Sequence, residues 1–311
     1  MLKKVLSSEW LRAVLSVGLI YFAFRKVDVL HLFKEFTMVP PWFVVVMILY
    51  FIMTTAMGGI RWSWLVLEKT GLKDYWNFTR AAYLGGFYGL FFPTGLAADA
   101  IKWVPLLSRY PELSKTKIAA SVLIDRIIGL AAFVIVGFGA LLMGQSLGYV
   151  FPPILLLVFG GLFFGTVGFF IVVFLFDYEK YFDNYFGRFT LYKRLIQVMD
   201  ILKKGNRRRI LNCFLLSLAA EPIWMIPTWF YSNIFGAGVS LLQVYIFIPV
   251  ISLILLLPIS VAGFGARENL FLFFLVPLGY APEKVLLMST FGGVLAVLNS
   301  LIGGLLIFIK K

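Results

Sequence analysis

The chain has 311 residues, of which 61% are hydrophobic and 14% are charged, and its net charge is +13. Soluble domains contain about 45–50% apolar and about 25% charged residues, so this composition excludes an ordinary soluble protein and indicates an integral membrane protein. The basic residues flank apolar stretches, a placement that orients membrane proteins, and this argues against nucleic acid as a partner.

The chain has few of the residues and motifs that usually bind metals or nucleotide cofactors. Cys213 is the only cysteine and His31 the only histidine, which excludes an intrachain disulfide and a histidine-ligated metal cluster. The chain has no Walker-type phosphate loop, which disfavours ATP hydrolysis. We therefore expect neither a metal nor a cofactor.

Six apolar stretches approach or exceed the length of about 20 residues that a helix needs to span a bilayer. The first follows Lys3 and Lys4, as in a signal peptide, but no small-residue cleavage site comes after it, so we expect it to be retained. In chain order the predicted spans cover residues 10–24, 41–60, 118–143, 152–176, 210–235 and 284–309.

Two further apolar segments, 81–98 and 241–279, are interrupted by proline and glycine beside charged residues. In lipid, a broken helix persists only where protein or a wet cavity satisfies its backbone. Paired breaks in the two halves of a chain are typical of the substrate sites of transporters. The alternative is that each segment crosses the membrane as a span kinked at its proline.

The distribution of basic residues favours hairpins over kinked spans. With the N-terminus in the cytoplasm, Arg80 and the basic loop 102–117 place both flanks of the first broken segment inside. The loops beside the second, 236–240 and 279–284, are nearly uncharged, which places both of its flanks outside. Each broken segment should therefore be a re-entrant hairpin that returns to the side from which it entered.

The predicted fold is an all-α polytopic membrane protein with about six full transmembrane helices and two re-entrant hairpins in an inverted-topology repeat. Residues 1–311 form a single membrane domain in this prediction. The first repeat covers about 1–143 and the second about 152–311, with a basic cytoplasmic linker at about 177–209. Both termini should lie in the cytoplasm and the protein in the cell membrane.

Charged residues at membrane depth are costly and usually face a cavity or a partner. Asp99 and Lys102 follow the first break three positions apart, so they can form a local ion pair on one helical face. Asp125 and Arg126 are helix neighbours that point about 100° apart, so each needs a partner from another element. Arg126 could meet Asp99 or extend towards the inner membrane surface.

The second half of the chain carries three such residues. Glu221 lies midway along the span 210–235, where the alternative to a functional role is a protonated, hydrogen-bonded carboxyl. Arg267 and Glu268 follow the second break. Asp125 or Glu268 is expected to pair with a basic residue of another element.

The breaks themselves could bind an anion. A helix that restarts after Pro93-Thr94-Gly95 or after Gly263-Phe264-Gly265 presents N–H groups that attract phosphate. Lys102, Arg126 and Arg267 are close to these breaks in the sequence, and Arg suits bidentate phosphate contact. An anionic lipid phosphate is therefore the expected ligand.

These motifs resemble those of the lysylphosphatidylglycerol synthase transmembrane, or flippase-like, family of bacterial and archaeal membrane proteins. The resemblance covers nearly the whole chain, and its most specific motif is the last one. It rests on Arg61-Trp62, on Pro93-Thr94-Gly95 with Asp99 and Lys102, on Asp125-Arg126 with Gly129, and on Pro258-Ile259-Ser260 with Gly263-Phe264-Gly265-Ala266-Arg267-Glu268.

The resemblance implies translocation between leaflets of lipids such as aminoacylated phosphatidylglycerol or polyprenyl-linked sugars. The family's soluble aminoacyltransferase domain is absent from these residues, so lipid synthesis is not implied. Ala97-Ala98 replaces glycine common in relatives, and Lys102 stands where Arg is common, so the headgroup preference stays open. The predicted substrate-binding residues are Arg61, Pro93, Gly95, Asp99, Lys102, Asp125, Arg126, Glu221, Pro258, Gly263, Gly265, Arg267 and Glu268.

We therefore expect a lipid transporter rather than an enzyme, with membrane lipids as its partners. One alternative is an intramembrane lipid-modifying enzyme, for which a single histidine offers little acid–base chemistry. The other alternative is a non-catalytic partner of a separately encoded glycosyltransferase or synthase.

Overall fold

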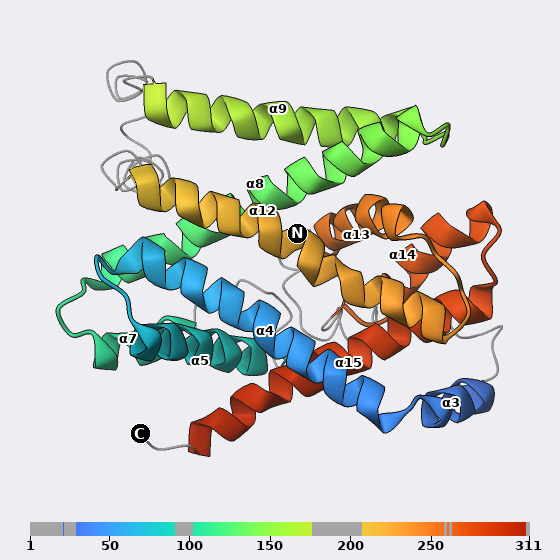
Figure 1. Ribbon diagram of the computed structural model, residues 1–311, viewed down its shortest axis with the longest axis horizontal. Helices are drawn as coiled ribbons and strands as arrows, with labels where there is room; N and C mark the ends of the chain where they lie inside the picture. The colour runs from blue at the N-terminus through green and yellow to red at the C-terminus, as the bar shows by residue number, and fades with distance from the viewer. Residues whose placement is uncertain are drawn as a thin grey trace, which may run out of the picture.

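The computed structural model describes residue 21 and residues 29–90, 102–175, 207–257, 260 and 263–308. Helices connected by short turns make up this part of the chain, which contains no strand (Figure 1). The elements are α3 (Val29–Met38), α4 (Pro41–Val66), α5 (Leu72–Gly89), α7 (Val104–Arg109), α8 (Lys115–Ser146), α9 (Pro153–Leu175), α12 (Arg207–Ile234), α13 (Leu241–Leu255), α14 (Ala266–Leu275), a 3₁₀ turn (Val276–Leu278) and α15 (Pro282–Phe308).

Five of these helices, α4, α8, α9, α12 and α15, are long and apolar enough to cross a membrane. They confirm the predicted spans at 41–60, 118–143, 152–176, 210–235 and 284–309, whereas the predicted span 10–24 lies outside the described residues. The protein is thus an all-helical polytopic membrane protein.

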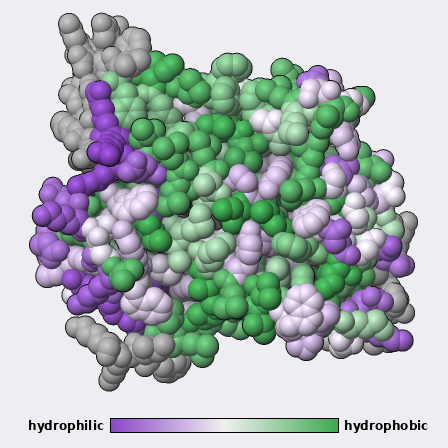
Figure 2. Space-filling view, viewed as in Figure 1, coloured by the Kyte–Doolittle hydropathy of each residue, from purple (hydrophilic) through white to green (hydrophobic). Residues whose placement is uncertain are grey.

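Much of the outer surface is hydrophobic, as lipid contact requires. On α9, Leu157 is 71% exposed and Phe164 is 68% exposed, and Figure 2 shows a broad hydrophobic face with a hydrophilic rim at its left. That rim lies where Figure 1 places the starts of α5, α8 and α12. We refer to this side as the basic end, because Lys73, Lys115 and Arg207 begin those helices or lie in their first turns.

The second broken segment folds back on itself. Helix α13 ends at Leu255 and α14 begins at Ala266, and the turn between them contains positive φ angles at Gly263 and Gly265, a conformation that favours glycine. The Tyr280 hydroxyl, after α14, donates a 2.5 Å hydrogen bond to Oε1 of Gln243 in the first turn of α13. The start and the exit of this segment therefore lie together, which supports a hairpin over a single kinked span.

The first broken segment begins earlier than the sequence predicted. Helix α5 starts at Leu72 rather than at 81, because the Asp74 carboxylate caps it by accepting a 2.9 Å hydrogen bond from the Gly71 N–H. Arg80 consequently lies inside α5, where its guanidinium donates to the Leu306 carbonyl at 2.8 Å, and it does not flank the segment as expected.

The two ends of the first broken segment also lie together, and we call the place where the two ends of a broken segment meet its mouth. The Tyr110 hydroxyl, directly after α7, donates to Oδ1 of Asp74 at 2.6 Å and accepts from the Asn77 amide at 3.1 Å. The start of α5 therefore lies against the end of α7. Residues 91–101, between them, are outside the described part of the chain.

The two mouths lie at opposite ends of the bundle (Figure 1). The mouth of the first segment is at the basic end, where Arg209 of α12 donates to the carbonyl of Glu68 at 2.6 Å. The mouth of the second is at the other end, where Lys284 donates to the Gly236 carbonyl at 2.9 Å.

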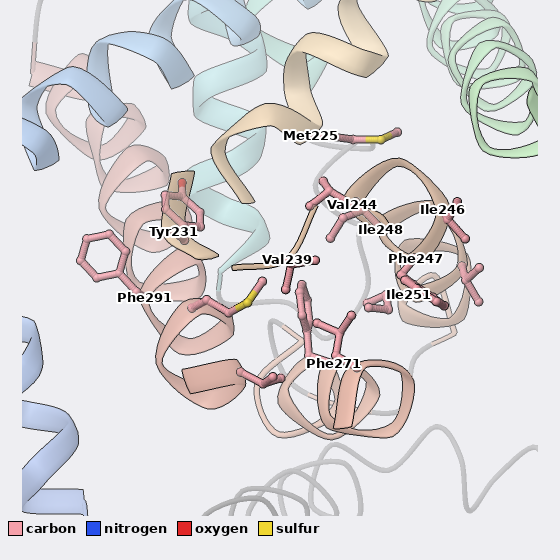
Figure 3. Packing of buried hydrophobic residues seen from close by; sticks show 14 of the residues in the cluster. Met225, Tyr231, Val239, Val244, Ile246, Phe247, Ile248, Ile251, Phe271 and Phe291 are labelled. Carbon is pink, nitrogen blue, oxygen red and sulfur yellow. The ribbon is translucent and has the colours of Figure 1, made fainter. Parts of the chain in front are cut away.

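The main hydrophobic core surrounds the second hairpin. Met225 and Tyr231 of α12, Ile248 of α13, Phe271 of α14 and Phe291 of α15 belong to this buried cluster. In Figure 3, Ile248 and Phe271 lie near Val239, and Phe291 lies beside Tyr231 on the other side of the view. The ring of Phe291 lies 5.5 Å from that of Tyr231, edge to face. This packing fixes α13 and α14 against α12 and α15, and so positions the charged residues at their break.

Candidate functional site

A cavity of about 960 Å³ lies between α4, α12, α15 and the second hairpin. Two arginines line it: Arg126 of α8, and Arg267 at the start of α14. Gly89, the last residue of α5, also borders it, so both broken segments reach this cavity. Much of its polar wall is hydroxyl or amide groups, from Thr54, Thr55, Thr228, Tyr231, Ser252, Ser260, Ser289, Asn299 and Ser300.

Two consecutive glycines of α15 make room for the Arg267 side chain. A Cβ atom at Gly293 would lie 2.8 Å from Nη2 of Arg267, and one at Gly292 would lie 3.0 Å from the ring of Tyr231. The guanidinium and the phenol therefore rest against the backbone of α15. On its other side, the guanidinium lies 5.3 Å from the centre of the Phe264 ring, a cation–π contact.

Glu268 closes the start of α14. Its side chain is 1% exposed, and its Oε2 accepts a 2.6 Å hydrogen bond from the Gly265 N–H. A carboxylate thus already occupies the place where we expected the restarting helix to present a free N–H to an anion. Among the described residues, the base that pairs with Glu268 is its neighbour Arg267, with Nε 3.7 Å from Oε1, and not a residue of another element.

Three buried polar atoms beside this cavity have no hydrogen-bond partner among the described residues: the Tyr231 hydroxyl, Nε of Arg267 and Oε1 of Glu268. Buried polar groups are nearly always hydrogen-bonded, and exceptions require an explanation. Tyr231 and Arg267 both line the cavity, so these atoms suit a site that binds a polar group.

A second group of charges joins three helices. Nε of Arg61 in α4 donates a 2.7 Å hydrogen bond to Oδ1 of Asp125 in α8, and Nη1 donates to the Ser217 hydroxyl in α12 at 2.9 Å. The same Nη1 lies 3.9 Å from Oε1 of Glu221. Gly129 makes room for the guanidinium, because a Cβ there would lie 3.3 Å from Nη2.

Lys102 extends this group. Its ammonium lies 4.0 Å from Oδ2 of Asp125 and 4.8 Å from the centre of the Trp62 ring. Asp125 therefore meets basic residues of other elements, as predicted, although the sequence did not identify which ones. A smaller cavity of about 310 Å³ adjoins the group, and its wall includes Arg61 and Glu221.

Several predicted site residues lie outside the described residues: Pro93, Gly95, Asp99 and Pro258. The expected pairs of Asp99 with Lys102 and of Asp99 with Arg126 are therefore not described. Of the others, Arg61, Lys102, Asp125 and Glu221 come together in one group, and Arg126, Gly263 and Arg267 line the large cavity. Gly265 and Glu268 form the cap beside it.

Sequence reasoning missed four residues of these sites. Ser217 and Tyr231 carry no recognisable signal, because only the packing of α12 against its neighbours brings them to the arginines. The adjacent glycines Gly292 and Gly293 were a usable signal, since small residues in membrane helices permit close approach.

No group of His, Cys, Asp and Glu suited to a metal ion occurs in the part of the chain that the structure describes. No curated protein and no solved structure matches the chain. One family model does, that of the lysylphosphatidylglycerol synthase TM region, and it matches residues 10–303. Since this match covers nearly the whole sequence, the chain belongs to the lysylphosphatidylglycerol synthase TM region family.

Proposed function

We propose that the protein is a flippase-like transporter, not an enzyme, which moves a lipid with a polar, phosphate-containing headgroup between leaflets. The observation that carries this proposal is the cavity of about 960 Å³ with Arg126 and Arg267 in its wall. Charged side chains at membrane depth are costly, and in membrane proteins they typically mark a substrate pathway. Family membership supports a lipid-related role.

The chemistry of the cavity suits a phosphate that carries a hydroxylated group. Arg binds phosphate through parallel N–H bonds, and the hydroxyls of Thr228 and Ser252 can bond to glycerol, aminoacyl or sugar atoms. Apolar side chains such as Ile251 and Phe271 complete the wall. Aminoacylated phosphatidylglycerol and polyprenyl-linked sugars are the two substrate classes that we propose.

The transport mechanism we propose is alternating access in an inverted repeat. In each hairpin, the hydroxyl of a tyrosine after the hairpin donates a hydrogen bond to the side chain of the third residue of the first helix. Tyr110 donates to Asp74, 36 positions earlier, and Tyr280 donates to Gln243, 37 positions earlier. Each acceptor side chain also accepts a hydrogen bond from the backbone N–H of the residue before its helix, Gly71 for Asp74 and Ser240 for Gln243. The two matched mouths at opposite ends support a repeat whose halves open the cavity to each side in turn. In this proposal the protein lies in the cell membrane, the basic end faces the cytoplasm, and both termini are on the cytoplasmic side.

The experiment is leaflet transfer by the purified protein in liposomes, with a panel of labelled lipids. Phosphatidylglycerol, its aminoacylated form and a polyprenyl-phosphate sugar should move faster than in protein-free vesicles, and a neutral glycolipid should not. Arg126→Gln and Arg267→Gln should each slow transfer by about tenfold or more, because each removes a charge that meets the phosphate. Glu283→Gln, on the exposed first turn of α15, serves as the control.

Chemical analysis of the same lipids separates transport from catalysis. Each lipid should be recovered unaltered. A modified lipid would favour an intramembrane enzyme. Absence of transfer, together with specific capture of a glycosyltransferase or synthase, would favour the role of a non-catalytic partner.

A further inference from the structure

Arg61 has two competing carboxylates where α4, α8 and α12 meet. It makes a direct 2.7 Å hydrogen bond to Asp125, whereas Glu221 is 3.9 Å away, beyond hydrogen-bond distance. Among the described residues, no hydrogen bond reaches the Glu221 carboxylate. Glu221 is thus the loosely held member of the group.

The smaller cavity, of about 310 Å³, leaves room for water beside Glu221. Glu221 and Arg61 both line it, and its other walls include Thr54 and Trp224. Thr54 and Trp224 also line the large cavity. Trp224 is three residues beyond Glu221 on α12, so both side chains lie on the same face of that helix. The carboxylate is therefore next to the proposed lipid path.

We propose that Glu221 binds the driving ion, a proton, and that its protonation couples proton movement to lipid transfer by changing how Arg61 is held. This inference rests on the proposed function. The carboxylate accepts one proton from water in the small cavity and later returns that proton to water, and no other bond forms or breaks.

The charges that face Glu221 come from two helices. Helix α4 contributes Arg61, and α8 contributes Asp125 through Arg61, while Arg126 of α8 lines the large cavity. Helix α13 has no charged residue, and the charged residues of α15, Glu283 and Lys284, occupy its first turn at the far end. Lys102 acts on the group through Asp125.

Protonation changes the balance of attraction between helices. With Glu221 ionised, α12 holds the guanidinium of Arg61 through a carboxylate and through the Ser217 hydroxyl. With Glu221 neutral, the Coulomb attraction to α12 is lost, and among the described residues Asp125 of α8 becomes the only carboxylate partner of Arg61. A proton thereby loosens α12 from α4, and Trp224 on α12 transmits the change to the lipid cavity.

Liposomes with an imposed pH difference and a clamped membrane potential test the coupling. Coupling of one proton to one lipid should shift the distribution of labelled lipid between leaflets by about tenfold for each unit of pH difference. Glu221→Gln, which mimics the neutral carboxyl, should still allow downhill transfer but show no shift. Glu283→Gln, the matched control at an exposed carboxylate, should respond as the wild type does.

Two outcomes overturn the coupling: a wild-type distribution that ignores the pH difference, or a Glu221→Gln variant that still follows it. Infrared difference spectra test the site independently of transport. Between about pH 5 and about pH 9, where buried Glu residues titrate, the wild type should show a protonated-carboxyl band that Glu221→Gln lacks. If no lipid moves at all, the proposed function fails, and this band still decides whether Glu221 binds a proton.

Discussion

Arg61 connects α4, α8 and α12 through one guanidinium, whose side chain is 14% exposed. Removal of one partner from such a buried pair leaves the other charge uncompensated, which is more costly than loss of the pair as a whole. The group formed by Arg61, Asp125 and Glu221 should therefore behave as a unit in mutational tests.

Single and double substitutions test this unit. Arg61→Gln and Asp125→Asn should each lower the free energy of unfolding by about 3–5 kcal/mol, and the double variant should lose less than the sum of the two. Unfolding of the purified protein in detergent, followed by helical circular dichroism, gives these values. Strictly additive losses would show that the two side chains do not interact.

Gly293 provides a test of the position of Arg267. In Gly293→Ala, the new Cβ would lie 2.8 Å from Nη2, so the flexible guanidinium must move while the helix keeps its backbone. We expect lipid transfer to fall by about tenfold, because Arg267 is displaced. The unfolding temperature should change little, because the higher helix propensity of Ala, by about 1 kcal/mol, offsets the cost of moving the guanidinium.

The control for this variant is Gly139→Ala on α8, since a Cβ there meets nothing within 4 Å. It should transfer lipid at the wild-type rate. If Gly293→Ala is as active as Gly139→Ala, the packing of Arg267 against Gly293 of α15 is not needed for transfer.

The sequence predicted individual site residues better than their partners. The cost of charge in lipid made Asp125, Glu221 and Arg267 candidates because of their positions within apolar segments. It could not show that Arg61 is the base that meets Asp125, because the pair is 64 positions apart in the chain. The cap by Glu268 was also missed, because a carboxylate three residues after Gly265 can turn back only once the local backbone is known.

At the scale of elements, each hairpin is closed by one tyrosine hydroxyl. Tyr110 lies outside the membrane-spanning helices, and burial raises its pKa from 10.0 to about 12, with a smaller contribution from the Asp74 carboxylate that accepts its hydrogen bond. The phenol is thus kept neutral, as a donor, over a wider pH range than in the unfolded chain.

This shift predicts a loss of stability at high pH. Below about pH 10 the Tyr110 contribution is fully present, and between pH 10 and about 12 the unfolded chain releases the phenolic proton while the folded protein retains it. Stability should therefore fall more steeply over this range in the wild type than in Tyr110→Phe. Thermal unfolding of both proteins as a function of pH measures this difference in the fall of stability, and parallel curves for the two proteins would contradict the prediction.

The sequence predicted the elements well wherever hydropathy determines them. The five long helices follow directly from apolar stretches of sufficient length. Helix α5 was placed too late because its first turns contain Lys73, Asp74 and Arg80 and read as a polar loop. Asp74 accepts a hydrogen bond from Tyr110 and Arg80 donates one to α15, and hydropathy cannot reveal such tertiary contacts.

At the scale of the whole molecule, the matched mouths predict the exposure of both ends. In a Cys213→Ala background, cysteines at Leu113 and Thr190 should resist an impermeant thiol reagent added outside intact cells, because the proposed orientation places both positions in the cytoplasm. A cysteine at Val150, in the turn between α8 and α9 and 93% exposed, should react. Labelling at position 113 but not at position 150 would reverse the proposed orientation.

The central claim is that the lipid headgroup passes through the cavity of about 960 Å³ that Arg126 and Arg267 line. Ser252, on α13, lines that cavity, and Val150 lies on the far-end surface. Each can be replaced by cysteine in the Cys213→Ala background. In the purified protein, before reconstitution, this cysteine is then modified with a bulky reagent that forms a mixed disulfide with it.

The decisive measurement is leaflet transfer of labelled phosphatidylglycerol before and after this modification. The modified Ser252→Cys protein should transfer at least about tenfold more slowly, recover when a reductant removes the group, and differ from Val150→Cys, which should not change. If fully modified Ser252→Cys moves lipid as fast as the unmodified protein, the lipid does not pass through this cavity and the account is wrong.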